Sequence, residues 1–415
     1  MRLFFLLFLL LLSSSVSSQL NISIPLGAQD QSEQKTSNLN SSFDDTYIET
    51  YSSESDSVSS DTSKVMNKLN DVNEFMEWYM KYFPVPFGSY SAETSWLFGL
   101  SKYNAFKMRK GDLNDTITQA SSLSLFAYVT LKDQYKIVLE SNLMFNKNKA
   151  QWKTDFIYTV YPLEFFGLGN ETNIKNQRTL NTSDFQFSSF YQFKIWKKWY
   201  LGPEYDFYNY YDVELAEHSV PIPGDSAIFA HNIGIQSGLG IKLSKEGRDN
   251  RFNARSGYYV DIAYQVFDHA FGSEYDYNYF KADIRYYVTP FDFLTIAMQA
   301  RTESKKGDVP VQSLALLGGD YSMRGIYLGR YRDKVLLDTQ VELRFPIFWI
   351  ISGVAFGGLG QVAPDYDQLN LDAFHYTYGA GLRLMVDSEH RVNMRFDLGF
   401  SEDQTIFIMQ FSEAF

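Results

Sequence analysis

Residues 334–345 read KVLLDTQVELRF, and their side chains alternate between two chemically opposite faces. Successive side chains of a β-strand point to opposite sides of a sheet, so every second residue shares a face. The apolar face holds Val335, Leu337, Val341, Leu343 and Phe345, and the polar face holds Lys334, Asp338, Gln340, Glu342 and Arg344. The stretch therefore predicts a strand that is apolar on one side and charged on the other.

The same alternation recurs from about residue 95 to the end of the chain, most clearly at 280–288 and 391–398. The segments are about ten residues or longer, which is the length that a tilted strand needs to cross a bilayer. Aromatic residues crowd the segment ends, as at 207–211 and 376–378, where an interfacial girdle lies in membrane barrels. We count roughly sixteen segments, an even number as such barrels require.

Composition excludes several classes of protein. The 415 residues include no cysteine, so disulfides, thiolate metal sites and thiol nucleophiles are excluded. The net charge of −12 argues against a nucleic-acid partner. Aromatic residues make up 17% of the chain, but the mean hydropathy of −0.26 is too polar for a helical membrane protein. The five histidines show no metal-ligand spacing and no catalytic motif is found, so no enzyme, metal or cofactor is expected.

The N-terminal segments indicate export. Residues 1–18 have the basic start, apolar core and small-residue exit of a cleaved signal peptide. Residues 19–62 are rich in Ser, Asn and Asp, which predicts a disordered linker. Apolar residues at three- and four-residue spacing predict an amphipathic periplasmic helix over 63–83, which either packs on the mouth of the next domain or acts as a plug or a partner-binding helix.

These features together predict an all-β protein. We expect residues 84–415 to form a transmembrane antiparallel β-barrel of about 16 strands in the outer membrane, because only a closed sheet satisfies every backbone group in lipid. The final strand would present one apolar face ending in a terminal aromatic at the membrane edge, and would close against the first strand. That face comprises Phe407, Met409, Phe411 and Phe415. A secreted soluble β-sandwich remains the alternative fold.

Residues 313–348, SLALLGGDYSMRGIYLGRYRDKVLLDTQVELRFPIF, followed by GVAFGGLGQVAP at 353–364, resemble the outer-membrane assembly-factor superfamily, also called the bacterial surface antigen family. The resemblance extends over nearly all of 85–415. It implies that a loop with an Arg-Gly-aromatic motif folds back into the barrel lumen. The matching residues are Gly318, Gly319, Arg324, Gly325 and Tyr327, with the aromatic displaced one place by Ile326.

The resemblance also implies partners for the loop. Glu342 lies on the polar face of its strand and is the expected partner of Arg324, because a confined guanidinium needs an opposite charge. The family usually adds an aspartate on the next strand in a Phe-x-Asp-x-Gly pattern, whereas this chain has Gly358 within FGGLG at 356–360. We therefore expect a weaker or rearranged latch.

The expected function is outer-membrane biogenesis. Assembly factors of the superfamily carry polypeptide-transport-associated domains before the barrel, and none is expected between residue 18 and the first strand, so this chain resembles the barrel-only members. We expect it to help insert or export proteins or lipids, in contact with outer-membrane lipid and with other outer-membrane proteins or lipoproteins. The alternative is a passive channel or structural barrel, whose lumen would be lined by Lys281, Arg285, Arg301, Glu303, Glu342, Arg395 and Asp397.

Overall fold

The structure is a computed structural model that describes residues 60–91, 95–106, 108, 118–216, 219, 233–388 and 390–415. The predicted signal peptide at 1–18 lies outside these residues, and so does the predicted linker up to residue 59.

Within the described residues the chain forms one α-helix, eighteen strands and five short 3-10 helices. The helix is α3 (Ser60–Tyr82), and the strands are β1 (Val85–Ser91), β2 (Ser95–Phe106), β3 (Ser121–Thr130), β4 (Tyr135–Phe145), β5 (Ala150–Phe165), β6 (Arg178–Trp196), β7 (Trp199–Leu215), β8 (Gly234–Glu246), β9 (Gly257–Phe267), β10 (Tyr277–Phe291), β11 (Leu294–Gly307), β12 (Ala315–Leu317), β13 (Tyr331–Asp333), β14 (Val335–Phe348), β15 (Ile351–Ala363), β16 (His375–Asp387), β17 (Val392–Phe400) and β18 (Thr405–Phe411). The 3-10 helices are η1 (Ile174–Asn176), η2 (His269–Phe271), η3 (Val311–Ser313), η4 (Tyr366–Gln368) and η5 (Leu371–Ala373).

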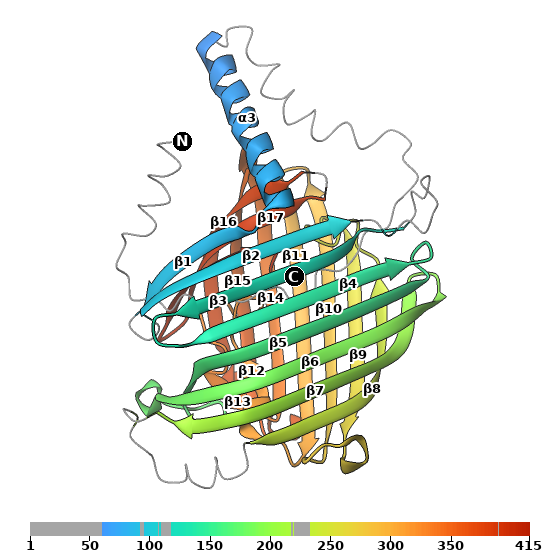
Figure 1. The fold of residues 1–415 in the computed structure, drawn as a ribbon, viewed down its shortest axis with the longest axis vertical. Coiled ribbons are helices and arrows are strands. Elements are labelled where there is room, and N and C mark those ends of the chain that lie inside the picture. Colours follow the sequence, from blue (N-terminus) through green and yellow to red (C-terminus); the bar gives the residue numbers. More distant parts are fainter. Residues whose placement is uncertain are drawn as a thin grey trace.

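Sixteen of the strands form one antiparallel sheet whose order follows the chain. β14 lies directly beside β11, because β12 and β13 leave the sheet and pair with each other. Figure 1 shows the sheet curling round, so that β1 to β7 cross the front while β10, β11 and β14 to β17 run behind them. The predicted all-β barrel of about sixteen strands is confirmed.

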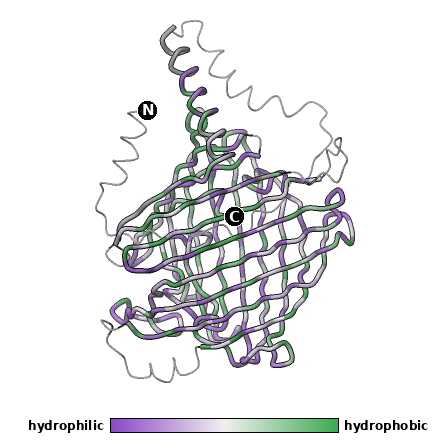
Figure 2. Tube along the Cα trace, in the orientation of Figure 1, coloured by the Kyte–Doolittle hydropathy of each residue, from purple (hydrophilic) through white to green (hydrophobic). Residues whose placement is uncertain are grey.

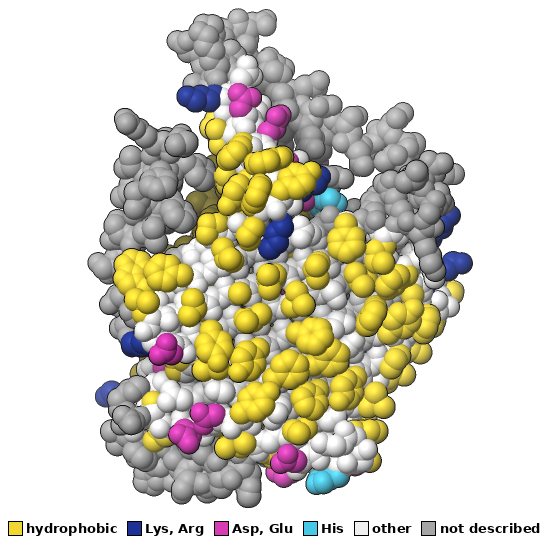
Figure 3. All heavy atoms as spheres, in the orientation of Figure 1, with side chains coloured by type: hydrophobic (Ala, Val, Ile, Leu, Met, Phe, Trp, Pro, Cys, Tyr) yellow, Lys and Arg dark blue, Asp and Glu magenta, His cyan; other side chains and the backbone are white. Residues whose placement is uncertain are grey.

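Burial in this sheet is the reverse of that in a soluble protein. Val341 and Leu343 are 41% and 38% exposed, whereas Glu342 between them is completely buried. Hydrophobic and hydrophilic positions alternate along the strands (Figure 2), and hydrophobic side chains spread over the face of the sheet that Figure 3 shows. The alternation at 334–345 therefore directs apolar side chains outward to lipid and charged ones inward.

The helix begins earlier than the sequence predicted. α3 starts at Ser60 rather than at residue 63, so the last three residues of the predicted linker belong to its first turn. Over the described residues, no helix is both long and apolar enough to cross a membrane.

The last residues correct a second prediction. β18 ends at Phe411, and a positive φ of 70° at Ser412 turns the chain away from the strand. Phe415 consequently leaves the outer face formed by Phe407, Met409 and Phe411, and it is buried at 5% exposure beside Tyr287. The terminal aromatic thus packs inside the barrel rather than at the membrane edge, because the interior offers an aromatic ring and an arginine for it.

Candidate functional site

The connection between β11 and β14 folds into the barrel. Its β12–β13 hairpin packs against β14 and β15. Its apolar side chains form a buried cluster with the inner side of the sheet, comprising Ala315, Leu317, Met323, Ile326, Tyr331, Leu336 and Val362. Gly318 and Gly319 have φ values of 105° and 109°, and Gly319 donates its N–H to the Ile326 carbonyl at 2.9 Å. The predicted lumen loop therefore has a hydrophobic anchor of its own.

Arg324 stands at the tip of this loop and is only 1% exposed. Its Nη2 atom lies 2.6 Å from Glu342 Oε2, and its Nη1 donates a hydrogen bond of 2.7 Å to Asp397 Oδ2. The guanidinium carbon lies 3.7 Å from the ring centroid of Phe356. The structure thus brings Arg324 and its predicted partner Glu342 together, with a second carboxylate and an aromatic face.

Both carboxylates are shared with other arginines. Glu342 Oε1 accepts from Arg344 Nε at 2.7 Å, and Asp397 accepts from Arg383 at 2.5 Å and from Arg395 at 2.8 Å. Arg383 also bonds Glu413 at 2.7 Å, so Glu413 belongs to the same network. We call this network the latch cluster; it comprises Arg324, Arg344, Arg383, Arg395, Glu342, Asp397 and Glu413. Removing one partner from such a network leaves a buried charge without compensation.

The second acid differs from the one that the family pattern suggested. Gly358 on β15 faces Met323, whose Sδ would lie 3.0 Å from a Cβ at that position, so the space beside Gly358 is taken by the methionine of the lumen loop. Asp397 on β17 is the second acid that pairs with Arg324, at 2.7 Å. The sequence held a signal for this residue. Asp397 lies on the polar face of 391–398, and Leu398 and Gly399 follow it as in the Asp-x-Gly part of the family pattern.

The loop approaches the β17 backbone very closely at Gly325. Its φ is 117°, and a Cβ there would lie 2.7 Å from the Phe400 nitrogen. The Arg324 carbonyl would in turn lie 2.5 Å from a Cβ at Gly399. Two facing glycines therefore allow the contact that aims Arg324 at Asp397.

The predicted aromatic, Tyr327, sits at the other side of the motif. Its hydroxyl accepts a hydrogen bond from the Glu164 backbone N–H at 3.2 Å, and its own N–H donates to Gln404 at 2.8 Å. Sequence reasoning missed Arg330 on the same loop, which bonds Asp403 at 3.1 Å and Thr172 at 2.6 Å. The motif thus ties the loop to the β5–β6 and β17–β18 connections as well as to the latch cluster.

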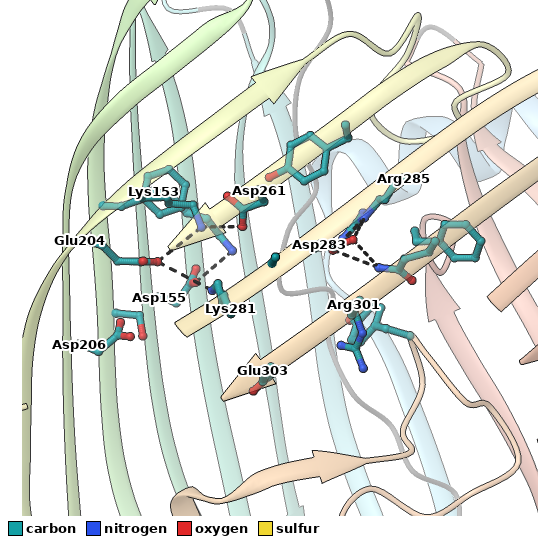
Figure 4. A pocket seen from close by; sticks show the side chains of 18 of the residues that line it. Lys153, Asp155, Glu204, Asp206, Asp261, Lys281, Asp283, Arg285, Arg301 and Glu303 are labelled. Carbon is teal, nitrogen blue, oxygen red and sulfur yellow. Dashed lines mark hydrogen bonds and ion pairs between the residues drawn. The ribbon is translucent and has the colours of Figure 1, made fainter. Parts of the chain in front are cut away.

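A second polar region lies beside the latch cluster. A cavity of about 380 Å³ is lined by charged side chains that point into the barrel (Figure 4), among them Lys153, Asp155, Glu204, Asp206, Asp261, Lys281, Asp283, Arg285, Arg301 and Glu303. Among the lining residues, Lys242 lies 2.8 Å from Asp261, and Arg301 lies 2.5 Å from Asp338 of β14. Of the predicted lumen residues, Glu342, Arg395 and Asp397 belong to the latch cluster rather than to the lining of this cavity.

The two ends of the sheet, β1 and β18, define a junction that we call the seam. Among the described residues no hydrogen-bonded ladder joins these strands. A hydrophobic cluster brings the two sides together, with Tyr103 of β2 on one side and Phe411 of β18 on the other. Met80 of α3 and the buried Phe252 join the same cluster. Side-chain packing therefore replaces backbone pairing at this point.

A sixteen-stranded antiparallel sheet with an apolar outer surface and a charged interior defines a transmembrane β-barrel of the outer-membrane type. The chain belongs to the Omp85 superfamily, because residues 97–412 match the Omp85 superfamily domain. The resemblance inferred from the Arg-Gly motif is thereby confirmed, and the protein is one of the Gram-negative outer membrane. Family membership associates it with the insertion or secretion of proteins at that membrane.

Solved structures with a similar fold are distant in sequence. CdiB from Escherichia coli has a TM-score of 0.52 at 12% identity, over 77% of this chain and 58% of that chain. BamA from Haemophilus ducreyi lacking POTRA domains 1–3 has a TM-score of 0.48 at 14% identity, over 79% of this chain and 68% of that chain. This chain thus spans less than two thirds of the CdiB chain. No curated protein matches the sequence.

The first prediction tests the latch cluster. Replacing Arg324 with Ala leaves Glu342 and Asp397 with less compensating charge, so we expect the free energy of unfolding to fall by about 3–5 kcal/mol. Arg391→Ala is the matched control, because Arg391 is partly exposed and forms its ion pair with Asp249 near the surface. It should lose about 1 kcal/mol or less. Urea unfolding in micelles, followed by heat-modifiable gel migration, measures both; equal losses would contradict a buried latch.

The second prediction tests the close approach at Gly325. Gly325→Ala forces a Cβ against the Phe400 backbone, and we expect it to cost about 1–3 kcal/mol beyond the strain of a positive φ. Gly272→Ala provides the control, since Gly272 has a φ of 85° but a Cβ there meets nothing within 4 Å. The same unfolding assay compares the two variants. A Gly325→Ala variant as stable as Gly272→Ala would show that the loop is free to move away from β17.

Proposed function

We propose that this barrel works in outer-membrane biogenesis by engaging client or partner polypeptides at its seam. The observation that carries the proposal is the absence, among the described residues, of a ladder between β1 and β18. Strands at the edge of a sheet present unpaired N–H and C=O groups, and a second chain can pair with them. A seam packed by side chains opens at a lower cost than one held by a row of backbone hydrogen bonds.

The latch cluster supports this proposal by stabilising only one side of the seam. Glu342, Arg383 and Asp397 lie on β14, β16 and β17, and Glu413 follows β18. Arg324 joins them to the lumen loop. The strands leading to β18 are therefore held as a rigid unit. We therefore expect β1 and α3 to be the elements that move when the seam opens. Within the described residues, no ion pair joins either element to the latch cluster.

The proposal predicts that polypeptides contact the sheet ends in cells. A photo-crosslinking amino acid placed at Met409 of β18 should form adducts with other outer-membrane or periplasmic proteins. Placed at Ile241 of β8, which is outward-facing, 53% exposed and paired on both edges, it should form few. Mass spectrometry of the adducts, and of a pull-down of the tagged chain from solubilised outer membranes, identifies the partners. Equal adduct yields at both positions, or no protein recovered, would reject a role at the seam.

A passive channel is the second candidate, and the charged cavity favours it. The lining residues of Figure 4 give a polar interior, but the latch cluster and the lumen loop occupy the space beside it. We expect rare, flickering openings of the wild-type protein in planar bilayers. Gly325→Ala, which pushes the lumen loop away from β17, should increase the conductance. Large and steady openings of the wild type would favour the channel instead.

A further inference from the structure

The C-terminal half of α3 carries an uncovered aromatic face. Phe75, Trp78 and Tyr82 are 58%, 50% and 62% exposed, and they follow one another at three- and four-residue spacing. The rings contact each other along the helix, with centroids 5.9 Å apart both between Phe75 and Trp78 and between Trp78 and Tyr82. Phe83, 46% exposed, extends the row. So large an apolar face on one helix needs a partner that covers it.

The opposite side of α3 is bound to the barrel. Trp349 Nε1, in the β14–β15 turn, donates to Asn70 Oδ1 at 3.0 Å, and Ser388 Oγ, in the β16–β17 turn, donates to Glu77 at 3.4 Å. Met80 packs into the hydrophobic cluster at the seam. These contacts fix the rotation of the helix about its axis, so that the aromatic face points away from the protein.

The end of α3 lies at the edge of the lipid-facing surface. Lys102 shares the outward row of β2 with Phe98 and Leu100, which are 53% and 48% exposed, and its Nζ donates to the Met80 carbonyl at 2.7 Å. A cation at the C-terminus of a helix satisfies both its free carbonyls and its dipole. The lysine therefore binds the helix end from the face of the sheet that contacts lipid.

The barrel end of β17 is covered as well. Val392 continues the outward row of Leu398, which is 41% exposed, yet Val392 is 3% exposed, and Val386 at the register shift of β16 is 7% exposed. Both belong to the cluster that includes Met80. In Figure 3 the hydrophobic side chains of the lower part of the helix reach down to those on the sheet.

We propose that the aromatic face of α3 lies in the headgroup region of the periplasmic leaflet of the outer membrane. The turns at this end, such as 292–293 and 349–350, are short, as periplasmic turns of outer-membrane barrels are. Trp and Tyr rings favour that depth because one part of the ring is apolar and another can reach water. The lipid surface completes the burial that the barrel begins, since the face is continuous with the apolar belt of the sheet.

This anchoring has a consequence for the seam. Met80 fills the hydrophobic cluster at the seam from the same helix that carries Trp78 and Tyr82. Two residues, Phe83 and Pro84, separate the end of α3 from the start of β1. A helix anchored in lipid therefore stabilises both the side-chain packing at the seam and the position of β1. The membrane thus contributes to the stability of the seam.

The test uses the absence of cysteine from the chain. We introduce single cysteines by Phe75→Cys and Tyr82→Cys and label each with an environment-sensitive fluorophore. The control is Glu74→Cys, labelled in the same way, because position 74 lies beside Phe75 on the flank of the helix. The full chain is reconstituted in vesicles of phosphatidylethanolamine and phosphatidylglycerol, and gel migration confirms folding. We expect a nitroxide on the upper acyl chain of the lipid to quench positions 75 and 82 at least about twofold more than position 74, and aqueous iodide to do the reverse.

Two outcomes would overturn the proposal. Equal quenching by iodide at positions 74 and 75 would place the aromatic face in water, and protection from both quenchers would place it against protein. If Phe75→Cys fails to fold, Trp78→Cys gives the same reading from the centre of the face. A failure here leaves the proposed role of the seam intact, because photo-crosslinking at Met409 tests that role without reference to lipid.

Discussion

The buried ion pairs of Arg324 fix the lumen loop inside this barrel. Arg324 reaches the lumen on a loop, and its guanidinium is shared between Glu342 and Asp397 on two different strands. Neither carboxylate is accessible to solvent, so each must be neutralised by the arginines around it. The arginines in turn share these two carboxylates. The positions of β14, β16 and β17 relative to the loop follow from this mutual neutralisation. The apolar cluster of the loop stabilises its burial without fixing its orientation. The ion pairs of Arg324 fix the position of the loop tip.

The two sides of the seam differ in how they are held. The β18 side is tied to the lumen loop through the latch cluster, and Arg344 also bonds the Phe415 carbonyl at 3.0 Å. The β1 side depends on side-chain packing by Met80 and Tyr103, and on hydrogen bonds that α3 accepts from Lys102, Trp349 and Ser388. Charge pairing is directional and hydrophobic packing is not, so the first side is rigid and the second can give way. This asymmetry unites the proposed function with the proposed lipid contact of α3.

Much of the fold could be read from local patterns. The alternation at 334–345 correctly placed Glu342 inside and Val341 outside, because the period of a strand is fixed by its backbone geometry. The Arg-Gly motif located the lumen loop, and the polar face of its strand identified the partner of Arg324. Phe415 was assigned wrongly, because the alternation was extended past Ser412, where the backbone turns. The start of α3 was also placed three residues too late.

The sequence alone determined the class of protein: which side chains face lipid, roughly how many strands the barrel sheet has and which loop carries the Arg-Gly motif. These properties depend on residues close together in the chain, and a periodic pattern records them. The tertiary structure decided that Asp397 and not residue 358 completes the latch, that Phe415 turns inward, and that α3 packs at the seam with its aromatic face uncovered. Each of these depends on atoms far apart in sequence, such as Arg324 and Asp397 or Met80 and Val392. Only the closure of the sheet brings such groups within contact distance.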